Sequence, residues 1–130
     1  MMQGIRIRQP GRKDKEQMMK LVRKLYSKKS RKQIELFDQN YLNCLQSTYI
    51  AEKDGKIIAY LALGGNQTKI DIGDLYVLKD YRRFGIASEL IRLTIERAKK
   101  MGRKFIEVSP RKWNKAAQKL YAKFGFKQIG

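Results

Sequence analysis

The chain has 130 residues, 42% of them hydrophobic, which is enough for one folded domain with an apolar core over residues 1–130. It has 30 lysines and arginines against 12 acidic residues, one cysteine (Cys44) and no histidine. These counts exclude imidazole catalysis, His-containing metal sites and an internal disulfide. No apolar run approaches the roughly 20 residues that span a bilayer, and the first ten residues carry no apolar signal segment. We therefore expect a cytoplasmic protein with no membrane partner and no bound metal.

The formal net charge of +18 is unevenly distributed along the chain. Residues 12–32 hold ten basic and two acidic side chains, and residues 97–127 hold eleven basic and one acidic, whereas residues 34–78 are mildly acidic. Two basic flanks of this kind attract polyanions such as nucleic acid, an acidic protein surface or a phosphate-rich cofactor. A solvated, lysine-rich surface is the alternative interpretation.

The N-terminal third of the chain predicts one strand and two helices. Residues 5–8 alternate isoleucine with arginine, which indicates a short strand. Apolar residues recur at helical spacing over 18–26, and Asp14 with Gln17 resembles a capping box at the start of that helix. We expect a loop in the basic segment 27–32. A second helical stripe follows, formed by Ile34, Phe37, Tyr41, Leu42 and Leu45.

From Thr48 onward the pattern changes to that of strands. Two apolar runs are joined by Asp54-Gly55, which is typical of a tight hairpin. In chain order the predicted elements are strands at 48–53, 56–64 and 69–78, a helix at 85–100, a strand at 104–108, a helix at 114–124 closed by Gly125, and the start of a further strand. This order predicts a mixed α/β fold in three layers, with helices flanking a mainly antiparallel central sheet.

The stretch "YRRFGIAS", residues 81–88, lies where the third strand of the meander leads into a helix. The first N–H groups of a helix have no partner within it and attract anions, provided that no side chain blocks the approach. Gly85 and Ala87 keep that approach clear, and Arg82 and Arg83 add positive charge. The stretch matches neither a Walker A loop nor the dinucleotide-binding fingerprint. An ordinary turn glycine is the alternative reading.

Two blocks read together sharpen this prediction. "DLYVLKDYRRFGIASELI" contains Arg82-x-x-Gly85-x-Ala87, and "WNKAAQKLYAKFGF" follows about thirty residues later. The pair resembles the GNAT superfamily, the GCN5-related N-acetyltransferases, over about residues 69–128. In the second block the matching positions are Asn114, Ala117, Leu120, Tyr121, Lys123, Gly125 and Phe126. The resemblance implies the GNAT acyl-CoA N-acyltransferase fold and an enzyme that uses acetyl-CoA as co-substrate.

The resemblance also implies roles for individual residues. The loop and helix start would bind the pyrophosphate of acetyl-CoA, and the end of the preceding strand would pair with the pantetheine arm, with the N–H of Val77 directed at the thioester carbonyl. The implied cofactor-binding residues are Leu75, Tyr76, Val77, Arg82, Arg83, Phe84, Gly85, Ile86, Ala87, Ser88, Asn114 and Ala117. Tyr121 would protonate the departing thiolate, because a phenol is protonated at neutral pH. A core aromatic is the alternative reading of Tyr121.

The implied general base is Asp74, which precedes Leu75 on the predicted strand and points to the opposite face. Glu52 and Asp71 are further candidates, a chain of waters is another, and a solvated strand residue is the alternative reading of Asp74. The neighbouring Gly73 replaces an acidic residue found in some relatives, including polyamine acetyltransferases. Cys44, on an apolar stripe, is read as a core residue rather than a nucleophile.

The acceptor implied by the resemblance is a primary amine, on a lysine, a protein N-terminus or a small molecule. The basic segment 12–32 favours an acidic peptide or protein as its carrier, or a substrate attached to RNA. The rival hypothesis is a non-catalytic module of the same fold that binds nucleic acid or an acidic partner. Because relatives continue with a further strand, the sheet edge is also predicted to be open or completed by a second copy, in a homodimer.

Overall fold

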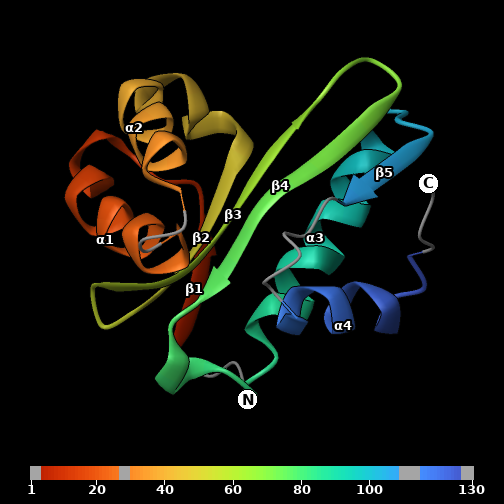
Figure 1. Ribbon diagram of the computed structural model, residues 1–130. Helices are drawn as coiled ribbons and strands as arrows, with labels where there is room; N and C mark the ends of the chain where they lie inside the picture. Colours follow the sequence, from red (N-terminus) through yellow and green to blue (C-terminus); the bar gives the residue numbers. More distant parts are fainter. Residues whose placement is uncertain (1–3, 27–29, 109–114, 127–130) are drawn as a thin grey trace.

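The computed structural model describes residues 4–26, 30–108 and 115–126. Figure 1 shows a three-layer molecule in which α1 and α2 cover one face of a central sheet, while α3 and α4 lie on the other. The helices and strands are β1 (Ile5–Arg8), α1 (Lys15–Tyr26), α2 (Arg31–Gln39), β2 (Thr48–Lys53), β3 (Lys56–Gly65), β4 (Lys69–Val77), α3 (Ile86–Lys100), β5 (Phe105–Val108) and α4 (Lys115–Lys123). The predicted mixed α/β architecture is confirmed.

The sheet has the order β1-β2-β3-β4-β5, and its strands are antiparallel except for the parallel pair β4–β5. Asp54 and Gly55 join β2 to β3 with φ values of 51° and 79°. Two consecutive left-handed residues match the right-handed twist of the strands, which is why this dipeptide closes a two-residue hairpin. α3 forms the crossover that returns the chain to the parallel strand β5.

The predicted capping box at the start of α1 is wrong. The Asp14 carboxylate accepts hydrogen bonds from Arg8 and from the backbone N–H of Gly11, and a short 3₁₀ turn precedes the helix. Gln17 instead reaches the β2–β3 hairpin, where it accepts from the N–H of Ile57 at 2.9 Å. Asp14 therefore binds residues that precede it, and Gln17 binds a strand 40 positions away, so neither side chain forms the predicted box.

The second predicted helix is shorter than its apolar stripe. Ser30 caps α2 through a hydrogen bond from the N–H of Gln33, so the end of the basic segment is helical rather than a loop. The helix ends at Gln39, where the Asn40 side chain donates to the Leu36 carbonyl at 2.9 Å, and a 3₁₀ segment continues over Tyr41–Ser47. The stripe therefore breaks, and Leu42 is 57% exposed.

The core lies on both sides of the central strands. Met18 and Val22 of α1 and Tyr60 of β3 are fully buried, as are Leu90 and Ile91 of α3. The apolar stripes of α1 and α3 supply this packing from opposite faces, as their helical periodicity predicts. Among the described residues, no helix has the length and hydrophobicity needed to cross a membrane.

Candidate active site

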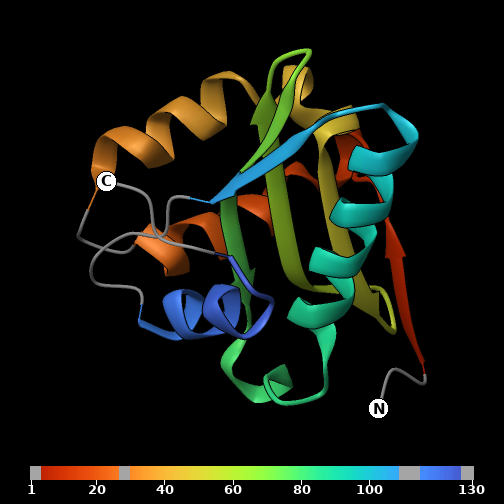
Figure 2. The same ribbon diagram turned by 90° about the vertical axis from the view of Figure 1, so that its right-hand side faces the viewer.

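The strand β4 diverges from β5 at a bulge. Ile72 pairs with Leu63 while Asp74 pairs with Ala62, so that Gly73 is an extra residue on β4. A bulge bends its strand, and the last β4–β5 pair within the described residues is Ile72 with Val108. Figure 2 shows β5 running at an angle away from β4, with α4 placed where the two strands separate. Among the described strands, the second half of β4 therefore pairs with β3 alone.

The second half of β4 has one backbone edge that no described strand pairs with. Leu78 donates its N–H to the Ile58 carbonyl of β3 at 2.8 Å, and the register is unbroken from there back to Asp74. Alternate residues of an antiparallel pair direct their backbone groups to opposite sides. Leu75 and Val77 therefore direct their N–H and C=O groups away from β3, as a strand does that can accept one more strand-like partner.

Arg82 closes part of this edge. Its Nε donates to the Val77 carbonyl at 2.8 Å, and its guanidinium lies over the Tyr76 ring, 5.4 Å from the centroid. Its guanidinium is thus tied to the end of β4, which connects that strand to the loop leading to α3. The next two residues, Arg83 and Phe84, are exposed, and Arg83 has a left-handed backbone with φ 73°.

The N-terminus of α3 is clear of side chains. Gly85 caps the helix with φ 82°, and its carbonyl accepts the first helical hydrogen bond, from Glu89 at 3.0 Å. The N–H groups of Ile86, Ala87 and Ser88 thus lie in the first turn and bond to no other described residue. A Cβ built on Gly85 would meet no atom within 4 Å, so an anion can approach these donors.

Asp74 is hydrogen-bonded by two buried tyrosines. The Tyr26 hydroxyl, at the end of α1, donates to one carboxylate oxygen, and the Tyr60 hydroxyl of β3 donates to the other at 3.1 Å. Burial, followed by the charge of Asp74, raises the pKa of Tyr60 well above its usual value. Asp74 therefore faces the α1 layer, and strand alternation places Leu75 on the opposite side, as predicted.

Tyr121 of α4 is 5% exposed and packs edge-on against Phe126, with ring centroids 5.7 Å apart. Burial, followed by the charge of Asp74, raises the pKa of Tyr121 above its usual value. The phenol therefore keeps its proton well above neutral pH. Its hydroxyl makes no hydrogen bond to the described residues, so the proton is available to a ligand.

The remaining predicted residues divide into three groups. Ala117 is buried on α4, one turn before Tyr121, whereas Asn114 lies outside the described residues. Glu52 is bound by Arg8 at 2.9 Å, two strands away from β4, which leaves no reason to retain it as a base. Asp71 lies before the bulge, 3.7 Å from the Lys69 ammonium, in the part of β4 that β5 covers.

Cys44 is half-buried in the 3₁₀ segment after α2, and burial raises the pKa of its thiol. A raised pKa lowers the fraction of reactive thiolate, which fits a packing residue better than a nucleophile. In the part of the chain that the structure describes, no group of three or more Cys, Asp or Glu side chains could hold a metal ion.

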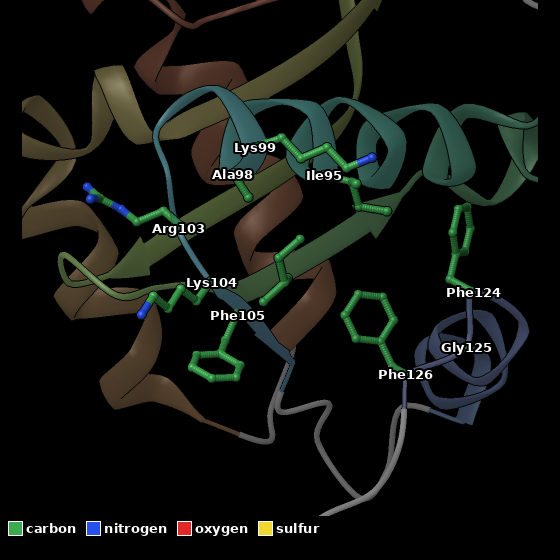
Figure 3. Close-up of a pocket in the computed structure, with 10 residues that line it drawn as sticks. Ile95, Ala98, Lys99, Arg103, Lys104, Phe105, Phe124, Gly125 and Phe126 are labelled. Carbon is green, nitrogen blue, oxygen red and sulfur yellow. The ribbon is translucent and has the colours of Figure 1, made fainter.

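A cavity of about 330 Å³ lies on the other side of β5, between that strand, α3 and the end of α4 (Figure 3). Its apolar lining includes Phe105, which is 59% exposed, and Phe126, and its basic lining residues are Lys99, Arg103 and Lys104. None of the residues predicted for acetyl-CoA or for catalysis lines it.

Comparison with known proteins identifies the family. A model described as the acetyltransferase (GNAT) family matches residues 15–126, which is most of the chain. The chain belongs to the GNAT acetyltransferase family. In this family member the end of β4, the loop after it and the start of α3 come from the first of the two blocks that carry the sequence resemblance, and α4 comes from the second.

Individual relatives agree with this assignment. An uncharacterized N-acetyltransferase of Methanocaldococcus jannaschii is 31% identical over 87 residues, which covers 62% of this chain and 38% of the relative. The chain thus spans less than half the length of that relative. A GNAT-family acetyltransferase of Staphylococcus aureus superposes with a TM-score of 0.86 at 21% identity, covering 97% of this chain and 86% of that one.

Arabidopsis thaliana Naa50, solved in complex with the bisubstrate analogue CoA-Ac-MVNAL, superposes with a TM-score of 0.79. It is 21% identical, and the match covers 98% of this chain and 85% of that one. At this low sequence identity, the two superpositions establish a shared fold alone.

The sequence interpretation missed Tyr26 and Tyr60 as partners of Asp74. Tyr26 was assigned to the apolar stripe of α1, and Tyr60 lies within the apolar run of β3. A tyrosine in an otherwise apolar run needs a partner for its buried hydroxyl, and that requirement is the one available signal. It does not say which residue the partner is.

Proposed function

We propose that this chain is an N-acetyltransferase that transfers the acetyl group of acetyl-CoA to a primary amine. The observation that carries the proposal is the continuity of two binding features. An open backbone edge on β4, at Leu75 and Val77, leads through a short loop to the free N–H groups at the start of α3. The first feature suits an extended amide-containing arm and the second suits a pyrophosphate.

Acetyl-CoA supplies an acyl group activated as a thioester. On this chain its pantetheine amides would pair with the β4 edge, and its pyrophosphate would accept hydrogen bonds from residues 85–88. Gly85 fits this role because its backbone is left-handed and no described atom occupies the space beside it. Arg83, exposed beside the helix start, adds positive charge. Because Arg82 donates to the Val77 carbonyl, binding of the pantetheine arm also requires that Arg82 shares or releases that carbonyl.

The chemical step needs a hydrogen-bond donor to the carbonyl oxygen, an acid that protonates the thiolate and a base that takes a proton from the amine. The amine nitrogen forms a bond to the carbonyl carbon, the bond from that carbon to sulfur breaks, and the thiolate leaves with the electron pair. The N–H of Val77 is the proposed donor to the carbonyl oxygen, where negative charge develops. Tyr121 gives its proton to the thiolate, and Asp74, directly or through water, takes a proton from the amine.

The acceptor class is proposed as an amine on a peptide or protein whose surroundings are acidic. The exposed face of α1 carries Lys20, Arg23 and Lys24, so a strongly cationic acceptor would be repelled. The analogue bound to Naa50 joins CoA to a peptide, which makes protein N-termini the first acceptors to test.

The test combines binding and turnover. Calorimetric titration with acetyl-CoA should show saturable binding at one site, and a CoA-release assay with peptides, lysine, polyamines and small amines should give turnover with at least one acceptor. Dephospho-CoA and free pantetheine serve as matched ligands, because loss of the pyrophosphate should weaken binding far more than loss of the ribose phosphate. No saturable binding of acetyl-CoA would contradict the proposal.

The second candidate is a module that binds a polyanion, and the cavity beside β5 favours it. Exposed aromatic rings beside basic side chains are typical of surfaces that bind single-stranded nucleic acid, and Phe105 lies beside Lys104 there. Binding of an RNA oligonucleotide at physiological salt, lost in Phe105→Ala together with Lys104→Ala, would support this candidate. A homodimer is a separate proposal, because β5 is an edge strand among the described residues and a second copy could extend it; light scattering tests it.

A further inference from the structure

Two tyrosines from different elements bind the Asp74 carboxylate, and a third lies within range of its charge. Tyr26 of α1 and Tyr60 of β3 donate to it directly. Tyr121 of α4 lies close enough for the charge of Asp74 to raise its pKa. Tyr76, two residues along β4, shares the face of Asp74 and contributes to the raised pKa of Tyr60. The half-buried carboxylate is thus held by hydroxyl groups from two separate elements, α1 and β3.

We propose that Tyr26 is a positioning residue of the reaction centre, whose hydroxyl, together with that of Tyr60, fixes the Asp74 carboxylate for the acceptor amine. The inference rests on the proposed function, since it assigns a role within the same site. It adds a contribution from α1, an element outside both sequence blocks that carry the family resemblance.

Packing alone does not explain these hydroxyls. Tyr60 is fully buried and Tyr26 is 3% exposed, and phenylalanine would fill the same space without a polar group to satisfy. A carboxyl group rotates freely about its last side-chain bond unless both oxygens are held. Here each oxygen accepts from a different layer of the molecule, one from α1 and one from the sheet. The plane of the carboxylate is therefore fixed by the tertiary structure.

The place of Tyr26 in the chain connects this contact to the acceptor. It is the last residue of α1, immediately before the segment that leads to α2. A change in the position of that helix end would carry the Tyr26 hydroxyl with it and alter the carboxylate that it binds. Tyr26 thereby couples the position of α1 to the orientation of the Asp74 carboxylate.

The test compares Tyr26→Phe with Tyr41→Phe. Both remove one hydroxyl from a buried tyrosine, but the Tyr41 hydroxyl donates to the Gly11 carbonyl and not to Asp74. We expect Tyr26→Phe to lower kcat about tenfold with a smaller change in KM for acetyl-CoA, and to move the acidic limb of the pH profile up by about one unit, because the carboxylate loses a donor. Tyr41→Phe should leave the profile unchanged. Tyr60→Phe is a second variant that should repeat the Tyr26→Phe shift.

A readout without turnover separates this inference from the proposed function. Carboxyl carbon NMR follows the titration of Asp74, assigned with Asp74→Asn, and its midpoint should rise in Tyr26→Phe and not in Tyr41→Phe. Among the described residues, the titratable groups that interact with Asp74 include Tyr26, Tyr60 and Tyr121. An unchanged midpoint in both Tyr26→Phe and Tyr60→Phe would overturn the inference even if the enzyme is active. Absence of turnover in the wild-type chain would instead count against the proposed function, and the NMR result would still decide the role of Tyr26.

Discussion

Arg8 joins two acidic residues that lie far from each other in the chain. Its guanidinium donates to Asp14 at 2.9 Å and to Glu52 at 2.9 Å, and Asp14 is almost completely buried. Hydrogen bonding to Arg8 lowers the pKa of both carboxylates below their usual values. This cluster fastens the edge strand β1 to β2 and to the start of α1.

Arg8→Ala should destabilise the fold by about 3 kcal/mol, because it leaves the buried Asp14 carboxylate without its cationic partner. Arg6→Ala is the matched control from the same strand. Its side chain is 75% exposed and only 4.0 Å from Glu52, so its loss should cost less than about 0.5 kcal/mol. Urea unfolding of both variants gives the comparison, and equal losses would contradict the role of Arg8.

Tyr121→Phe should keep acetyl-CoA binding and lower kcat by about 100-fold or more, since general acid catalysis contributes on this scale. The ring packing against Phe126 is retained, so folding should be little affected. Tyr49→Phe, which alters a hydroxyl on β2 that Arg97 contacts at 3.3 Å, is the control. Steady-state kinetics and calorimetry decide the point. A variant with wild-type kcat would remove Tyr121 from the mechanism.

The raised pKa of Tyr41 predicts that the folded protein loses stability at alkaline pH. Burial, followed by the charge of Asp14, raises its pKa from 10.0 to about 12. Between these values the unfolded chain releases the phenol proton and the folded chain retains it, so rising pH favours unfolding. The contribution is complete below pH 10 and should fall by on the order of 2 kcal/mol by pH 12. Unfolding of wild type and Tyr41→Phe across this range isolates it, and parallel pH dependences would contradict it.

At the scale of elements, α4 shows how a local signal ends a helix. Gly125 is left-handed with φ 88°. Its N–H donates to the Ala122 carbonyl, and the N–H of Phe126 donates to the Tyr121 carbonyl. This is the Schellman arrangement, with the expected apolar contact between Phe126 and Tyr121. The glycine read as a helix end in the sequence is confirmed.

A substitution at Gly85, at the start of α3, tests the anion site at this scale. Gly85→Ala should destabilise the fold by about 1 kcal/mol, because alanine at φ 82° is strained. It should also weaken acetyl-CoA binding by about tenfold, since the new Cβ stands in the open approach to the helix. Gly64→Ala is the control, at a glycine that also has no atom near its Cβ and whose φ is not positive. Thermal unfolding and calorimetry measure both effects, and unchanged affinity would argue against a pyrophosphate site here.

At the scale of the whole molecule, charge is the dominant feature. A net charge of +18 on 130 residues repels itself in the compact state. Several ion pairs, including Lys15 with Asp38 and Arg92 with Glu96, lie at the surface and contribute little. Most of the basic side chains therefore have no acidic residue available to pair with them.

Raising the sodium chloride concentration from about 0.1 M to about 1 M should raise the melting temperature by several degrees, because the screening length shortens from about 10 Å to about 3 Å. The stability gained by screening the repulsion should exceed the stability lost by screening the weak surface ion pairs. Glucose at equal osmolality serves as an uncharged control. A melting temperature that falls with salt would mean that attractive pairs outweigh the repulsion.

The amino-acid sequence by itself determined what depends on neighbours in the chain. Periodicity placed the strands and most helices, Asp54-Gly55 placed the hairpin, and Gly85 marked the start of α3, because these signals act within a few residues. The two motif blocks identified the family.

Only the tertiary structure decided which groups meet across layers. Tyr26 and Asp74 are 48 positions apart, and Arg8 and Glu52 are 44 apart, so their contacts exist only once the sheet has formed its register. A further long-range contact, from the N–H of Ile57 to Gln17, explains why Gln17 does not form the predicted cap.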